Sequence, residues 1–161
     1  MLIDALTDVL SDSGCLDTFW GKLDEGEDAA LGVAASARAF LIAARFTKDP
    51  RSTLVIVAGE DAATTYARNI AAYLGEEKVL RFSERSDVPH LKDKPDPVTI
   101  ARRLEAAHAL ATKQQTVVVA SARSLIRKLA PPDSKLAKPF VLKVGSELEE
   151  TEIGRASCRE R

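Results

Sequence analysis

The chain has 161 residues, of which 45% are hydrophobic, and its formal net charge is -1. This length suits one domain with a sizeable core, and the balanced charge excludes the strongly basic surface typical of nucleic-acid-binding domains. No run of about 18 apolar residues is present, so the sequence predicts no membrane-spanning helix. The start Met1–Asp4 lacks the basic residues of a secretion signal, which favours a cytoplasmic protein.

Residues 1–27 predict a helical segment that precedes the rest of the domain. Apolar residues recur at helical spacing over residues 2–13, and a second, shorter helix is expected over residues 16–23. The acidic run 24–28 is expected to be a solvated connector.

From residue 29 onward, predicted strands alternate with predicted helices. The expected strands cover residues 29–33, 54–58, 79–82, 116–120 and 140–145. Leu54–Ala58 is a continuous apolar run, typical of a parallel strand buried on both faces, whereas residues 79–82 are more typical of an edge strand. This alternation predicts an α/β fold, a parallel sheet with helices on both faces.

The helix expected after the long irregular stretch 83–97 has a clear start signal. Asp96 is a predicted N-cap, with Pro97 at the first helical position. The residues predicted to face inward are Ile100, Leu104, Ala107 and Ala111. Arg102 and Arg103 are therefore expected on the outer face.

Residues Leu31–Phe40 lie where the first predicted strand passes into a helix. A phosphate-binding loop with the pattern G-x-x-x-x-G-K-[ST] occupies this position in nucleotide-binding proteins. Gly32 matches the first glycine, but Ala37, Arg38 and Ala39 replace the second glycine, the lysine and the Ser/Thr. The stretch therefore has the layout of a nucleotide loop without its reactive side chains.

Each replacement removes one capability. The Cβ of Ala37 crowds the approach of a phosphate, and the forked guanidinium of Arg38 does not substitute for a compact lysine ammonium. Ala39 lacks the hydroxyl that binds magnesium. Ser36 and the N–H groups of the helix start still attract an anion weakly. We therefore expect a degenerate nucleotide loop that hydrolyses no ATP.

Other catalytic or metal-binding patterns are absent from the sequence. The two cysteines, Cys15 and Cys158, and the two histidines, His90 and His108, do not have metal-ligand spacing. No set of nucleophile, base and orienting residue can be assembled either. The sequence therefore predicts no catalytic residue and no metal site, and His108 is expected to be a partly buried helix residue.

The last ten residues, 152–161, resemble a translated sequencing adapter. We expect this tail to be non-native and exclude it from fold reasoning. The natural chain is then expected to continue beyond Thr151, so that the sequence is a fragment of a longer protein.

Five stretches, in this order and spacing, resemble the start of the bacterial transcription-repair coupling factors (Mfd), a region that is itself similar to UvrB of nucleotide excision repair. They are GVAASARAF (32–40), SERSDVP (83–89), PDP (95–97), ARRL (101–104) and VVVASARSL (117–125). The resemblance covers about residues 28–150.

The resemblance implies a RecA-like domain over residues 28–138, of the P-loop NTPase type but degenerate and incomplete. Residues 139–151 would begin an inserted domain that recruits UvrA. This chain would then be a non-catalytic scaffold without a cofactor, and would lack the main UvrA-binding surface. An incomplete sheet exposes apolar surface and strand edges, so we also expect poor solubility.

The parent protein implied by the resemblance is an ATP-dependent DNA translocase that displaces stalled RNA polymerase and recruits UvrA. Its ATP and magnesium belong to a motor domain far downstream, and UvrA, RNA polymerase and double-stranded DNA are reached through the parent. Arg85, Arg102 and Arg103 cluster around the long irregular stretch. They are candidates for contact with another domain or DNA, and the alternative is a plain solvated surface.

Two alternatives are weaker. A small active P-loop-like enzyme with an arginine loop would need a magnesium-binding carboxylate at the end of a buried strand. Neither Leu54–Ala58 nor Thr116–Ala120 ends in one, and Glu60 and Asp61, just beyond the first, are more typical of a helix cap. UvrB itself should have an intact Gly-Lys pair, against which the pair Ala37-Arg38 argues.

Overall fold

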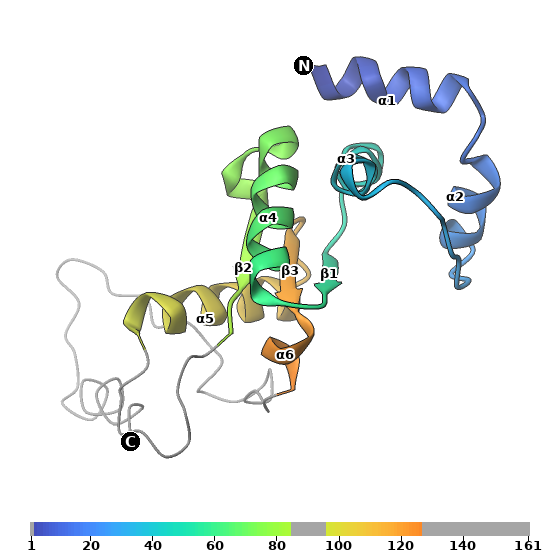
Figure 1. Cartoon of the computed structure of the whole chain (residues 1–161). Helices are drawn as coiled ribbons and strands as arrows, with labels where there is room; N and C mark the ends of the chain where they lie inside the picture. Colours follow the sequence, from blue (N-terminus) through green and yellow to red (C-terminus); the bar gives the residue numbers. More distant parts are fainter. Residues whose placement is uncertain (1, 85–95, 127–161) are drawn as a thin grey trace, which may run out of the picture.

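The structure is a computed structural model that describes residues 2–84 and 96–126 (Figure 1). Its helices are α1 (Leu2–Asp12), α2 (Asp17–Asp24), α3 (Ala35–Lys48), α4 (Glu60–Leu74), the 3₁₀ turn η1 (Glu76–Lys78), α5 (Pro97–Ala111) and α6 (Ala122–Leu125). Its strands are β1 (Thr53–Val57), β2 (Val79–Phe82) and β3 (Val117–Ser121). From β1 onward, strands and helices alternate along the chain, as expected.

The three strands form one parallel sheet in the order β1-β3-β2. Val117 of β3 lies opposite Thr53 of β1 on one side and Val79 of β2 on the other. The last described strand is therefore the central one, and all five of its residues are buried. The α/β class and the parallel sheet are confirmed.

Helices cover both faces of this sheet, as the sequence predicted. On one face α3 and α4 pack against alternate residues of β3, and this cluster consists of Ala39, Phe46, Ala63, Ala67, Ile70, Val117 and Val119. On the other face α5 packs through Ala106 against Val118 and Ala120 of β3 and Phe82 of β2. Alternate side chains of β3 therefore belong to two core clusters, one on each face of the sheet.

The expectation that residues 54–58 are buried on both faces is wrong. Exposure alternates along β1, and Leu54 and Ile56 are 42% and 57% exposed. β1 is an edge strand, and α5, on the face to which these two side chains point, packs chiefly against β2. β1 therefore has apolar side chains that the described residues leave exposed.

The inward face of α5 also differs from the prediction. Arg103, Ala106 and Ala109 are the buried residues of this helix, whereas Leu104 is 48% exposed. The small alanines let the helix lie close to the sheet, and the guanidinium of Arg103 finds polar partners there. The expectation that Arg103 faces outward is therefore wrong, and that for Arg102 is confirmed because it is exposed.

The local start signal of α5 is confirmed. The carboxylate of Asp96 accepts hydrogen bonds from the backbone N–H groups of Val98 and Thr99, at 3.4 and 3.0 Å. Pro97 occupies the first turn, as predicted. The hydrogen bonds from the backbone N–H and the hydroxyl of Thr99 lower the pKa of Asp96 below its usual value.

The two N-terminal helices lie on the α3 side of the molecule (Figure 1). Arg45 of α3 forms ion pairs with Asp24 at the end of α2 and with Asp49. Its guanidinium carbon also lies 5.6 Å from the ring centroid of Trp20 in α2. Helix α2 is thus attached to the α/β core through one arginine of α3.

Candidate functional site

The stretch that resembles a phosphate-binding loop does not follow a strand. Residues 29–34 are irregular, so the expected strand at 29–33 is wrong. Ala29, Ala30 and Gly32 have low strand propensity, and the segment does not pair with the free edge of β1. Helix α3 begins at Ala35, and its N-cap, Ala34, has no capping side chain.

The side chains of the loop positions have separate environments. Gly32, Ser36 and Arg38 are exposed, and Ala37 is half-buried. Ala39 is 5% exposed, and its methyl group belongs to the core cluster beneath α3. The position where a nucleotide loop carries its magnesium-binding hydroxyl is therefore an apolar core position here.

Arg38 lines a groove of about 850 Å³ beside the free edge of β1. Helices α2, α3 and α4 form the rest of this groove, together with Leu31 and Val33 of the irregular stretch. Its lining is largely apolar and includes the aromatic residues Phe19 and Trp20 of α2. It is a hollow beside the sheet edge rather than a cradle of backbone N–H groups.

The three arginines proposed as a contact cluster are not brought together as one surface. Arg85 lies outside the described residues. Arg102 is exposed on α5, whereas Arg103 is 7% exposed. Arg103 donates to the backbone oxygen of Ser83 at 2.5 Å and to that of Ser124 at 3.4 Å.

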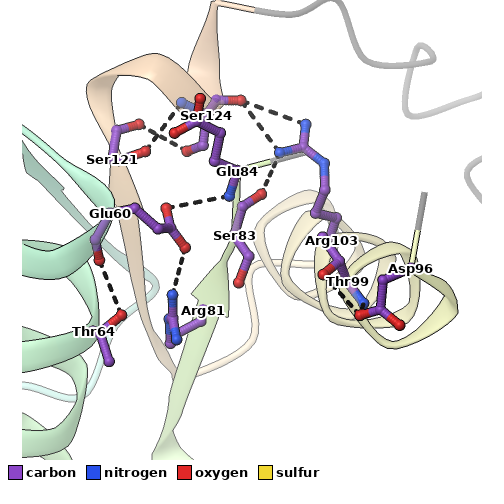
Figure 2. A network of polar contacts seen from close by, with 10 residues as sticks. All are labelled: Glu60, Thr64, Arg81, Ser83, Glu84, Asp96, Thr99, Arg103, Ser121 and Ser124. Atoms are coloured by element: carbon purple, nitrogen blue, oxygen red, sulfur yellow. Dashed lines mark hydrogen bonds and ion pairs between the residues drawn. The ribbon is translucent and has the colours of Figure 1, made fainter. Parts of the chain in front are cut away.

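The carboxyl ends of the strands, where α/β proteins commonly bind ligands, are joined by an internal polar network (Figure 2). Glu60, the first residue of α4 after β1, forms an ion pair with Arg81 of β2. The other oxygen of the Glu60 carboxylate accepts from the backbone N–H of Glu84 at 3.2 Å. This carboxylate therefore joins the segments that follow β1 and β2.

The end of β3 is followed by a short turn in which Ser121 and Ser124 hydrogen-bond to each other (Figure 2). The Ser121 hydroxyl accepts from the backbone N–H of Ser124 at 3.1 Å, and the Ser124 hydroxyl donates to the Ser121 carbonyl at 2.7 Å. The Nε of Arg123 lies 3.6 Å from the carboxylate of Glu84, two residues after the end of β2. The Glu60 and Glu84 carboxylates and the two serine hydroxyls at this sheet edge are therefore all paired. Sequence reasoning missed this network because its members are far apart in the chain.

Within residues 2–84 and 96–126, no group of three His, Cys, Asp or Glu residues is arranged to hold a metal ion. His108 is half-buried on α5, as expected. None of the helices in these two ranges is long and apolar enough to cross a membrane.

The fold and this site together define an α/β protein in which residues 2–84 and 96–126 form a three-stranded parallel sheet flanked by helices. Comparisons with protein-family models, with curated proteins and with solved structures find no match.

Proposed function

We propose that this chain is a non-catalytic scaffold and recruitment module, the UvrB-like region of a cytoplasmic transcription-repair coupling factor. The observation that carries the non-catalytic part is the environment of residues 32–39. No strand precedes them, and Ala39 lies in the core where a nucleotide loop needs a hydroxyl. The ordered set of five motifs between residues 32 and 125 supports the family assignment.

A RecA-like domain is the finer fold that we propose. The parallel sheet with helices on both faces supports it, since such domains are built from strand–helix units of this kind. The absence of a strand at 29–33 is consistent with an incomplete sheet that lacks the neighbour of that strand. Residues 139–151, proposed as the start of the inserted domain, lie outside the described residues.

In this proposal the catalytic activity belongs to the parent protein. The parent is an ATP-dependent translocase on double-stranded DNA that displaces stalled RNA polymerase and recruits UvrA. The chain itself contributes a folded module whose charges at the carboxyl edge of the sheet are paired with one another. Sequencing the source locus beyond the codon for Thr151 tests this parentage, because the frame must continue into a motor with an intact nucleotide loop.

The non-catalytic assignment is tested with the isolated 161-residue chain and magnesium-ATP. We expect no phosphate release above the protein-free blank. The triple variant Ala37→Gly, Arg38→Lys, Ala39→Thr serves as a matched control. We expect it to remain inactive, because Ala39 points into the core and no strand positions the loop. Magnesium-dependent turnover in the unmodified chain that disappears with Arg38→Ala would contradict the proposal and favour the small nucleotide-binding enzyme.

A further inference from the structure

The second edge of the sheet is bordered by a groove that the proposed function does not use. β2 pairs with β3 along one side, and no strand among the described residues pairs with its other side. A groove of about 610 Å³ runs along this free edge, and α4, β2 and α5 all contribute to its lining. Unpaired backbone groups on an edge strand are a template for a further strand.

The walls of this groove leave space beside the backbone of β2. Helix α4 contributes the small residues Ala67, Ala71 and Ala72. Val79 and Leu80 of β2 line the groove themselves, so the free edge of the strand is part of the cavity. The groove is therefore suited to an extended chain lying alongside β2 between the two helices.

The acidic side chains of the groove lie toward one edge of the sheet. Arg68 of α4, Arg81 of β2 and Arg102 of α5 all contribute to the lining of the groove. Helices α4 and α5 both run from the carboxyl edge of the sheet back to its amino edge, so Glu76 and Glu105 lie nearer the amino edge. Arg81 is already paired with Glu60, which leaves the exposed Arg68 and Arg102 as the outward-facing cations.

Arg68 and Arg102 lie on helices that cover opposite faces of the sheet. Successive side chains of a strand also point to opposite faces, so one added strand can present a carboxylate to each arginine. A nucleic-acid backbone fits less well, because its phosphates accept hydrogen bonds but cannot donate them to the free carbonyl groups of β2, as an added strand does.

We propose that this groove binds an extended acidic peptide segment of a partner protein, which adds to β2 as a further strand. Main-chain hydrogen bonds to the free edge of β2 supply affinity, and ion pairs with Arg68 and Arg102 select carboxylates. This inference goes beyond the proposed function and does not depend on it, since it requires neither a parent motor nor a nucleotide site.

The probe is a fluorescein-labelled octapeptide of alternating valine and glutamate, titrated with the full chain and followed by fluorescence anisotropy. Its matched control is the octapeptide of alternating valine and lysine. We expect the acidic peptide to bind about tenfold more tightly, and Arg68→Glu or Arg102→Glu to remove most of this preference. Arg38→Glu, an exposed arginine outside the groove, should change nothing.

Hydrogen–deuterium exchange distinguishes strand addition from a loose charge contact. The amides of Val79–Phe82 should exchange more slowly when the acidic peptide is bound, and those of β1 should not change. Equal affinity for the two peptides, or unchanged exchange in β2, overturns the proposal. Tighter binding of a single-stranded oligothymidine that is lost in the same arginine variants also overturns it and assigns the groove to nucleic acid.

Discussion

The guanidinium of Arg103 is enclosed where the end of β2, the start of α6 and helix α5 meet. It donates to two backbone oxygens, of Ser83 and Ser124, and its central carbon lies 4.0 Å from the ring centroid of Phe82. These partners are 20 and 21 residues away in sequence, so one side chain connects segments that the backbone does not. Its role in the described structure is to hold the carboxyl edge of the sheet together.

We expect Arg103→Met to lower the free energy of unfolding by about 3 kcal/mol, because it leaves two buried carbonyl groups without their donor. Urea unfolding of the full chain, followed by circular dichroism, measures this change as a shift of the midpoint. The neighbouring exposed residue provides the control, since Arg102→Met should change stability by less than about 0.5 kcal/mol. Equal effects of the two substitutions would show that Arg103 does not act as a structural connection.

For individual residues, the sequence predicts those contacts that are made with near neighbours in the chain. Asp96 is predictable as an N-cap because the backbone N–H groups that donate to its carboxylate lie within three residues of it. The burial of Arg103 could not be predicted, because it depends on carbonyl groups brought close by the folded sheet. Periodicity placed Leu104 inward, but the small Ala106 and the guanidinium of Arg103 face the sheet instead.

Among the elements, β3 and β1 show how position in a sheet decides what an apolar residue contributes. Val118 of β3 and Leu54 of β1 lie opposite each other in the same register and point to the same face. Val118 is fully buried beneath α5, whereas Leu54 is 42% exposed. The two residues therefore form a matched pair for measuring the effect of burial.

Val118→Ala should destabilise the chain by about 2 kcal/mol, because it removes two buried carbon groups and leaves a cavity. Leu54→Ala removes a larger side chain but should cost less than about 1 kcal/mol, since much of that side chain is already in water. Thermal unfolding of both variants measures the difference. A larger loss for Leu54→Ala would mean that the α5 face of β1 is covered in the folded chain.

Most elements could be predicted from patterns within each segment, and the exceptions share one cause. The edge strand Val79–Phe82 and the helix at Pro97–Ala111 agree with the sequence analysis. The strand expected at 29–33 is not formed, although its sequence position before a helix suggested one. Whether a segment comes to lie along the free edge of a strand depends on the folded sheet, and this cannot be read from the segment itself.

For the whole molecule, the most consequential feature is the side of β1 that the described residues leave uncovered. Leu54 and Ile56 are exposed on one face, and the apolar groove lined by Trp20 and Val55 lies beside the strand. The strand from Thr53 to Val57 has no charged residue, whereas charged residues are a common protection against edge-to-edge association. We therefore expect the poor solubility predicted from the sequence to originate at this strand.

We expect the purified chain to self-associate with rising concentration, and the double variant Leu54→Lys, Ile56→Lys to stay dispersed longer. Light scattering coupled to size-exclusion chromatography measures the apparent mass at each concentration. Val98→Lys and Leu104→Lys, at two other exposed apolar sites on α5, form the matched control. Equal improvement from both pairs would indicate general charge repulsion rather than an effect of the β1 edge.

The strand order β1-β3-β2 has a consequence for synthesis of the chain on the ribosome. β1 and β2 are translated first, but neither pairs with the other, and both depend on β3 for their ladder hydrogen bonds. The sheet therefore cannot assemble until Ser121, the last residue of β3, has left the exit tunnel. Until then β1 and β2 have no β3 to pair with. We therefore expect a chaperone that binds nascent chains to act mainly while residues 83–121 are being translated.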